Sequence, residues 1–124
     1  MNRHLILLAH GSPRAEWRLS IEALAERVRQ ATPVPVSLAW LEAAPPDLAA
    51  AGAAAVAAGA REVGVLPLFW SSGGHVARDV PDQVAALRHA WPGVVFEVLP
   101  TLGEHPRVVA AIADIAAALA VPEK

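Results

Sequence analysis

Two stretches of the chain, LILLAHGSP at residues 5–13 and VGVLPLFWSSGGH at residues 63–75, decide its fold. Each begins as an apolar run of strand length and changes within a few residues into a polar turn that contains glycine. In an open parallel sheet such a change marks the carboxyl edge, where ligands bind. Each stretch also carries a histidine near this change, His10 in the first and His75 in the second. We therefore predict that separate strands deliver two imidazoles to one edge of a sheet.

Strand-like and helix-like segments alternate four times along the chain, which is typical of βαβ units and a parallel sheet. We expect an α/β fold in which a four-stranded parallel sheet has helices on both faces, and a single domain over residues 1–124. The strand order is taken as the flavodoxin-like order 2-1-3-4, in which the first and third strands are neighbours and a crevice opens between them. With that order, His10 and His75 face each other. The expected strands cover residues 4–9, 34–41, 62–68 and 94–99.

Helices are expected after each strand because apolar residues recur there at helical spacing. The first has Ser12 as its N-cap and Pro13 at its first position. The second opens at residues 45–47, is almost pure alanine and ends near Gly59. The apolar faces expected of the other helices are Trp17, Ile21, Leu24 and Val28 in the first, Val80, Val84, Leu87 and Trp91 in the third, and Val108, Ile112, Ile115 and Leu119 in the last.

Composition excludes several classes of function. The net charge is −2 with 18% charged residues, which gives no basic footprint for nucleic acid. The chain has no cysteine, so disulfides, thiolate metal sites and cysteine nucleophiles are excluded. The first apolar run is too short for a signal peptide, and the alanine-rich residues 43–60 contain glycine and prolines. We expect a soluble cytoplasmic domain with neither a nucleic-acid nor a membrane partner.

The histidine pair predicts an open metal site. Neutral imidazole binds divalent cobalt, nickel, iron and zinc, whereas a closed zinc site needs four ligands, and this chain offers too few. An open site suits a metal ion that is passed on rather than kept. Glu42, at the end of the second strand, could be a third ligand, a proton acceptor or a cap of the second helix. The plain alternative is that His10 caps a turn and His75 bonds within its own loop.

Other residues at the same edge suit a large anionic ligand. Gly11, Ser12 and Arg14 offer backbone N–H groups, a hydroxyl and a guanidinium at a helix N-terminus, where anions bind. The turn after the third strand could be a backbone nest for anions or a plain flexible connection. Its residues are Ser71, Ser72, Gly73 and Gly74. The aromatic residues that could contact a flat ligand are Trp40, Phe69 and Trp70. Of the remaining histidines, His105 could line the rim or cap a helix, and His4 and His89 are expected to be structural.

Four blocks of sequence together resemble the small sirohydrochlorin chelatases, the CbiX-like cobaltochelatases. The blocks are LILLAHGSPR, AWLEAAPPDL, VGVLPLFWSSGGHVARDVP and LPTLGEHP. The resemblance implies the class II chelatase fold and a lyase of cobalamin or siroheme biosynthesis that inserts Co²⁺, or Fe²⁺ or Ni²⁺, into sirohydrochlorin. It implies that His10 and His75 bind the metal and assist pyrrole deprotonation. It also implies a homodimer with no organic cofactor, the metal ion being a substrate.

The sequence departs from the family pattern at two positions, and alternatives remain. Ala9 stands where a glycine often precedes the histidine, and Trp70 replaces a more usual aliphatic residue. A non-catalytic carrier or regulatory module that binds metal or tetrapyrrole on the same fold is the main alternative. A serine hydrolase using Ser12 is disfavoured because the G-x-S-x-G elbow is absent. Imidazole ligands do not separate cobalt, nickel and iron.

Overall fold

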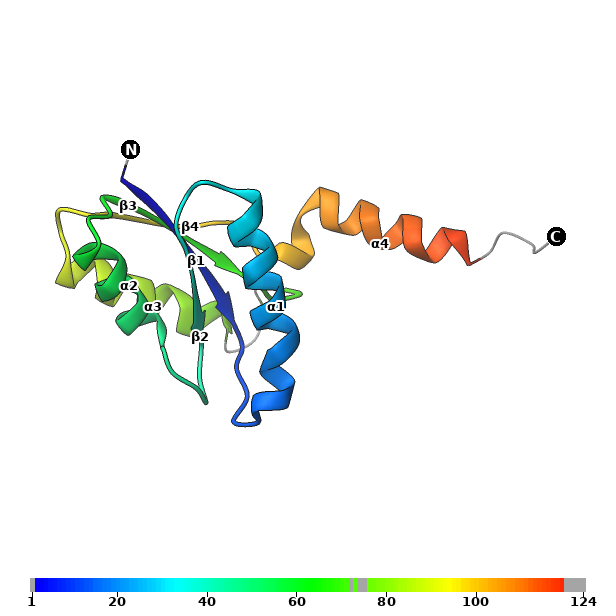
Figure 1. The fold of residues 1–124 in the computed structure, drawn as a ribbon, viewed down its shortest axis with the longest axis horizontal. Helices are drawn as coiled ribbons and strands as arrows, with labels where there is room; N and C mark the ends of the chain where they lie inside the picture. Colours follow the sequence, from blue (N-terminus) through cyan, green and yellow to red (C-terminus); the bar gives the residue numbers. More distant parts are fainter. Residues whose placement is uncertain (1, 72, 74–75, 120–124) are drawn as a thin grey trace.

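The computed structural model describes residues 2–71, 73 and 76–119, except for the side chains of residues 76 and 77. Strands and helices alternate along it, as Figure 1 shows. The strands are β1 (Arg3–Ala9), β2 (Val36–Trp40), β3 (Glu62–Pro67) and β4 (Val95–Val98). The helices are α1 (Ala15–Ala31), α2 (Leu48–Ala57), α3 (Val76–Ala90) and α4 (Pro106–Ala118), and a 3₁₀ turn, η1 (Leu102–Glu104), precedes α4. The expected strands agree with these bounds to within two residues.

The four strands form one parallel sheet in the order β2-β1-β3-β4. This confirms the predicted fold class and strand order. β1 and β3 are the central pair, with Leu5 opposite Gly64 and Leu8 opposite Pro67. The turn that follows β1 and the loop that follows β3 therefore leave neighbouring strands at the same edge of the sheet, the carboxyl edge.

The two faces of the sheet are covered unequally. Right-handed crossovers place α1 on one face and put α2 and α3 on the other. The α2/α3 face holds the larger core, in which the alanines of α2 allow the helix to pack close to the strands. Its buried members are Ile6, Leu8, Ala39, Leu41, Leu48, Ala51, Ala55, Ala60, Val63, Val65, Val80, Val84, Leu87 and Phe96. The smaller cluster, on the α1 face, has Leu7, Ala25 and Val36 as its buried members.

Two details of the helices differ from the sequence prediction. α1 begins at Ala15, not at Pro13, because the Ser12 hydroxyl accepts the N–H of Arg14 and stabilises a turn that precedes the helix. Trp17 and Leu24 were expected on the buried face of α1 but are 65% and 40% exposed, and Ala25 is the buried residue. The spacing was right, but the face that contacts the sheet is rotated towards Ala25.

The apolar face predicted for α3 is confirmed at three of its four positions. Val80, Val84 and Leu87 are buried against the sheet. Trp91 was expected to continue this face but lies just beyond the helix end at Ala90 and is partly exposed. None of the helices in the described part of the chain is long and apolar enough to cross a membrane.

α4 does not join either layer. It extends away from the sheet, as Figure 1 shows, and it has no buried residue. The apolar positions predicted for this helix are therefore present but uncovered within one chain; Ile115 is 69% exposed and Leu119 is 87% exposed.

Each of the two outer strands of the sheet accepts a hydrogen bond from an arginine side chain. Arg29 of α1 donates to the carbonyl oxygen of Val36 on β2, with an Nε–O distance of 3.1 Å. Arg88 of α3 donates to the carbonyl oxygen of Phe96 on β4 from Nε at 3.1 Å and from Nη2 at 2.7 Å. In the pairing register both carbonyls point away from the neighbouring strand. The outer hydrogen-bonding groups of β2 and β4 are thus partly satisfied within the chain.

Candidate functional site

His10 lies at the carboxyl edge, one residue after β1. The backbone around it is held on both sides: Leu41 N–H donates to Ala9 O at 2.7 Å, and Leu68 N–H donates to Leu8 O at 2.8 Å. The carbonyl of His10 itself accepts the N–H of Glu42 at 3.1 Å. The His10 side chain is exposed. A rigid backbone therefore presents this imidazole at the edge of the sheet.

Gly11 is required by the turn that follows His10. Its φ is +106°, a region that residues with a side chain rarely adopt. A Cβ at this position would also overlap the carbonyl oxygen of Glu42. Because the two loops approach so closely, the glycine fixes the direction in which the chain leaves His10.

The ring of His10 contacts the ring of Phe69, which comes two residues after β3. The ring centroids are 6.2 Å apart and the planes are at 86°, an edge-to-face arrangement. Phe69 is half-buried against the larger core. The loop that carries His75 therefore begins beside His10. His75 itself lies outside the described residues, so the predicted meeting of the two imidazoles remains a prediction.

The segment after β4 also contacts the loop that carries Phe69. Gly103 in η1 donates its N–H to the carbonyl of Phe69 at 3.0 Å. A Cβ on Gly103 would overlap the backbone of Trp70. The Trp70 side chain is 66% exposed, as a ligand contact requires. Sequence reasoning missed Gly103; its only signal was a glycine within the block LPTLGEHP.

Ser12 and Arg14 lie beside His10 but differ in accessibility. Ser12 is buried, its hydroxyl accepts the Arg14 N–H at 3.2 Å, and its carbonyl accepts a bond from Arg18 at 2.6 Å. Sequence reasoning did not single out Arg18. The Arg14 guanidinium is exposed, 3.5 Å from Glu16 and 5.2 Å from the centroid of the Trp17 ring. Arg14 can thus reach an anion in solvent, whereas Ser12 is mainly structural.

Only part of the predicted glycine-rich turn is described. Ser71 Oγ accepts the N–H of Gly73 at 3.4 Å, and both residues are exposed. Ser72 and Gly74 lie outside the described residues, like His75. Trp40, expected to contact a flat ligand, is 4% exposed and belongs to the interior. Phe69 and Trp70 are the two expected aromatic residues that lie at the edge.

The structure decides one of the alternatives for Glu42. Asp47 caps α2, since its carboxylate accepts the N–H of Ala50 at 2.8 Å, so Glu42 is not the cap. Glu42 is exposed, and its backbone is bonded to that of His10. Within the described ranges, no three His, Asp or Glu side chains gather closely enough to hold a metal ion. A ligand role for Glu42 would need His75 and remains a prediction.

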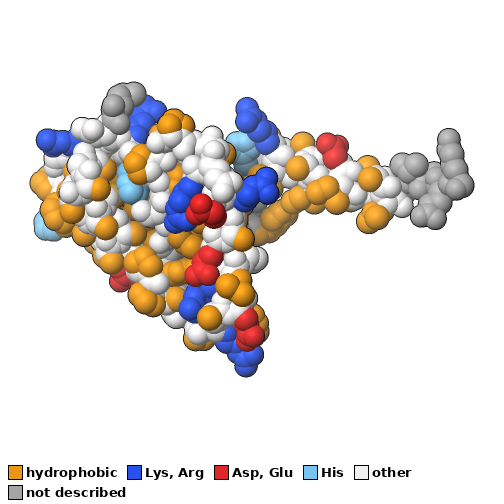
Figure 2. All heavy atoms as spheres, in the orientation of Figure 1, with side chains coloured by type: hydrophobic (Ala, Val, Ile, Leu, Met, Phe, Trp, Pro, Cys, Tyr) orange, Lys and Arg blue, Asp and Glu red, His pale blue; other side chains and the backbone are white. Residues whose placement is uncertain are grey.

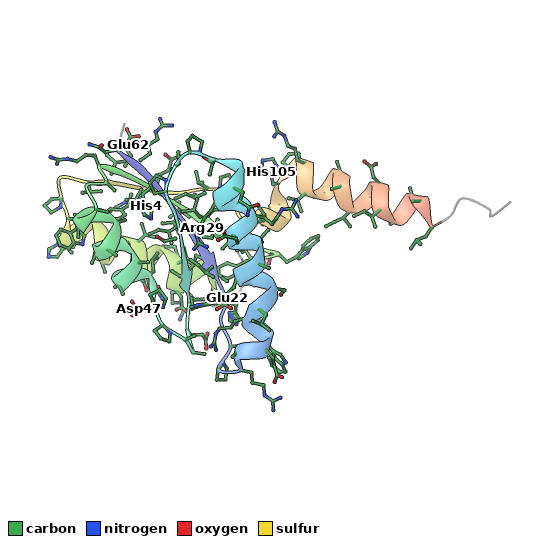
Figure 3. The ribbon with its side chains drawn as sticks, viewed as in Figure 1. His4, Glu22, Arg29, Asp47, Glu62 and His105 are labelled. Carbon is green, nitrogen blue, oxygen red and sulfur yellow. The ribbon has the colours of Figure 1, made fainter. Side chains whose placement is uncertain are left out.

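The other histidines have structural roles or lie away from the site. His105 caps α4, where its Nδ1 accepts the N–H of Arg107 at 3.1 Å. His4 lies at the amino end of β1, 2.6 Å from the hydroxyl of Ser37, and burial lowers its pKa. Figure 3 shows His105 at the start of α4 and His4 beside Glu62 at the opposite end of the strands from Asp47. His89 is exposed on α3.

The open parallel sheet places this protein among the α/β domains, in which ligands bind at the carboxyl ends of the strands. Within that class the sequence model of the CbiX family matches residues 4–118, and the chain belongs to this family. A chloroplastic sirohydrochlorin ferrochelatase of Arabidopsis thaliana is 31% identical over 82% of this chain and 45% of its own length. A sirohydrochlorin cobaltochelatase of Sulfolobus acidocaldarius is 32% identical over 64% of each chain. The chain thus spans less than two thirds of either relative.

Solved structures agree with the fold. A cobalamin biosynthesis CbiX protein from Marinobacter aquaeolei VT8 superposes with a TM-score of 0.83, at 33% identity, over 94% of this chain and 96% of that one. SirB from Bacillus subtilis, solved with Fe³⁺, superposes with a TM-score of 0.84 over 98% of this chain and 49% of its own. Its 24% identity supports the fold alone.

Proposed function

We propose that this protein inserts a divalent metal ion into sirohydrochlorin, with Co²⁺ as the first candidate and Fe²⁺ or Ni²⁺ as further candidates. The observation that carries the proposal is the placement of His10. In a CbiX-family chain its imidazole stands exposed at the carboxyl edge against Phe69, where the loop that leads to His75 begins. The two relatives described above are named for insertion of iron and of cobalt into this macrocycle.

The chemistry needs a group that can hold a cation and accept protons. As the metal ion enters the macrocycle, two pyrrole nitrogens each lose a proton, so the ion replaces two protons and the charge balances. A neutral imidazole can bind the ion or accept one of these protons near neutral pH. We assign both tasks to the pair His10 and His75, with Glu42 as a further ligand or proton acceptor.

The substrate is flat and carries several carboxylates, and we propose contacts of two kinds. The exposed guanidinium of Arg14 and the N–H groups of the turn formed by residues 71–74 engage carboxylates. The exposed ring of Trp70 lies against the macrocycle. Ser12 supports this site through its bond to the Arg14 backbone. A domain of this size cannot enclose the macrocycle easily, so we also propose that the protein works as a homodimer.

The direct test is anaerobic incubation with sirohydrochlorin and Co²⁺ or Fe²⁺, followed by absorbance. We expect His10→Ala and His75→Ala each to lower the rate by about 100-fold or more, because each removes a ligand or a base. His89→Ala is the matched control, since this exposed histidine lies on α3 and outside the site. Full activity in either site variant would contradict the role given to that histidine.

The same experiment separates an enzyme from a carrier. A wild-type rate no faster than the spontaneous reaction, with metal or tetrapyrrole binding retained, would identify a non-catalytic binding module. Comparing the rates with Co²⁺, Fe²⁺ and Ni²⁺ would then identify the preferred ion.

A further inference from the structure

One tryptophan is exposed at a position where helical spacing predicts burial. Trp17 shares its spacing with Ile21 and Val28, which are partly buried, yet Trp17 is 65% exposed in the first turn of α1. A tryptophan carries about 150–250 Å² of surface whose burial is favourable. Single exposed apolar residues are common on proteins, so exposure alone does not indicate a ligand site. The surroundings of Trp17 supply that indication.

The two most exposed tryptophans of the chain both lie at the carboxyl edge of the sheet. Trp17 follows β1, and Trp70, which is 66% exposed, follows β3. Of the other two, Trp40 is 4% exposed, and Trp91 is 36% exposed and follows α3 at the amino end of the sheet. Figure 1 shows the first turn of α1 beyond the tip of β1. Aromatic surface is thus exposed at the end of the sheet where His10 stands.

Hydrogen bonds tie Trp17 to the turn that follows His10. Ser12 Oγ accepts the N–H of Arg14 at 3.2 Å, and the carbonyl of Arg14 accepts the N–H of Trp17 at 3.1 Å. The guanidinium of Arg18, which follows Trp17, donates to the carbonyl of the buried Ser12 at 2.6 Å. These bonds hold the first turn of α1 against the turn after His10. The fold therefore sets the position of Trp17 relative to His10.

A cation lies against the ring of Trp17. The guanidinium carbon of Arg14 is 5.2 Å from the centroid of the indole, which is the geometry of a cation–π contact. Most of the tryptophan surface still faces solvent, because the residue is 65% exposed with Arg14 in place. Figure 2 shows hydrophobic, basic and acidic side chains together at the lower tip of the molecule, where the first turn of α1 lies in Figure 1. A flat apolar surface and a positive charge are offered side by side.

The ion pair that Arg14 makes is easily exchanged. Its Nη1 lies 3.5 Å from Oε1 of Glu16, and the two side chains are 65% and 66% exposed. An ion pair in such an exposed position adds little to stability, because water screens the two charges. A carboxylate of a ligand can therefore take the place of Glu16 at little cost, while Trp17 continues to hold the guanidinium.

We propose that Trp17 and Arg14 form one contact surface for the tetrapyrrole, in which the indole stacks on the macrocycle and the guanidinium binds a carboxylate at its rim. The identity of this ligand rests on the proposed function. Stacking alone does not select for charge, and an arginine alone does not select for flatness. The pair therefore selects ligands that are both flat and anionic, while the histidines of the proposed site handle the metal ion and the pyrrole protons.

The first test separates binding from catalysis. Sirohydrochlorin is varied at saturating Co²⁺ under anaerobic conditions, and its equilibrium binding without metal is followed by its visible absorbance. Trp17→Ala should raise KM and the dissociation constant by about 10-fold, the effect of losing a stacked ring, and change kcat by less than about threefold. Trp17→Phe should keep most of the affinity, because it retains an aromatic ring. Leu19→Ala is the matched control and should behave as wild type, since Leu19 is 61% exposed on α1 but about 200° around the helix from Trp17.

A second set of variants tests whether the two residues act together. Arg14→Gln should also weaken binding by about 10-fold, because it removes the charge that meets a carboxylate. Arg14→Gln combined with Trp17→Ala should lose clearly less than the product of the two single losses, since each contact depends on the other. Glu16→Gln should instead tighten binding by about two- to threefold, because it removes the competing carboxylate. Single losses that simply multiply would overturn the pairing.

The outcomes distinguish this contact surface from the proposed function. If wild type inserts the metal ion and Trp17→Ala leaves KM and the dissociation constant unchanged, the contact surface is wrong and the proposed function stands. If wild type binds the macrocycle without accelerating insertion and Trp17→Ala weakens binding, the contact surface is right and the enzymatic role is wrong. A changed molar mass of Trp17→Ala in light scattering would mean that Trp17 contacts another copy of the chain, and this would also overturn the proposal.

Discussion

The two ends of the sheet carry glycines in very different surroundings. At the carboxyl end, Gly11 lies against the carbonyl of Glu42 and Gly103 lies against the backbone of Trp70. At the amino end, Gly59 follows α2 and Gly93 follows α3, and a Cβ on either would meet nothing within 4 Å. The carboxyl loops are thus packed backbone to backbone, while the amino turns only reverse the chain.

This difference indicates where the fold needs precise geometry. The metal site proposed for the carboxyl end would require its ligands to be held by rigid supporting contacts. At the carboxyl end, backbone hydrogen bonds connect the segments that follow β1, β2 and β3, and η1 is bonded to the loop after β3. The turns at the amino end have no such requirement. Substitutions that insert the same methyl group at each end therefore test the comparison directly.

The largest effect is expected for Gly11→Ala. The alanine would have to adopt a positive φ, and its Cβ would have to displace the Glu42 carbonyl. We therefore expect a loss of about 3 kcal/mol or more in the free energy of unfolding. Urea denaturation gives this value. Under the proposed function, metal insertion should fall as well, because His10 is the preceding residue. A variant as stable as wild type would contradict the close packing of these loops.

Gly103→Ala should have the next largest effect. Here the collision with the Trp70 backbone acts without a positive φ, so the expected loss is about 2 kcal/mol. Gly93→Ala is the control at the amino end and should change the free energy of unfolding by less than about 0.5 kcal/mol. Equal losses in the two variants, measured by the same denaturation, would remove the distinction between the ends.

Gly59→Ala isolates the backbone contribution. Its φ of +100° is close to that of Gly11, but no atom obstructs the methyl group. We expect a loss of about 1 kcal/mol, which reflects the unfavourable φ alone. The difference in thermal or urea stability between Gly11→Ala and Gly59→Ala therefore measures the contact with Glu42.

The smallest effect is a pH dependence at the amino end. Burial lowers the pKa of His4 below its usual 6.5, so the unfolded chain binds a proton before the folded chain does. Stability from this group is complete above pH 6.5 and declines as the pH falls through 6.5 towards the folded pKa. Its neighbours are Ser37, which bonds to the ring, and the paired Arg3 and Glu62 at the same end. His4→Gln should flatten the slope of unfolding free energy against pH relative to wild type, and an unchanged slope would contradict this role.

The sequence predicted the fold well because its signals are local and repeated. Alternating strand-like and helix-like segments located every strand to within two residues, and the strand order taken from flavodoxin-like sheets is the order observed. It could not predict which side of α1 contacts the sheet, because the exposed Trp17 and Leu24 fit the same helical spacing as Ile21 and Val28, which are partly buried. It also could not predict that α4 stands apart, since an apolar stripe has the same pattern whether its partner lies in the same chain or another.

The site was predicted in part. The position of His10 at the carboxyl end of β1 follows from the end of an apolar run, and the structure places it there. The start of α2 was predicted at residues 45–47 from local sequence, and Asp47 is its cap. The burial of Trp40 depends on how the loop after β2 folds back, which no local pattern encodes. The contact between Gly103 and Trp70 joins two distant segments and could emerge only from the three-dimensional structure.

The arginines on β2 and β4 limit how copies of this protein can associate. With Val36 and Phe96 already accepting guanidinium bonds, neither outer strand offers a full row of free groups to a strand from another molecule. Continuous growth of the sheet into fibrils is thereby discouraged. The protein should therefore be less prone to form ordered aggregates at high concentration than a sheet whose outer strands are bare.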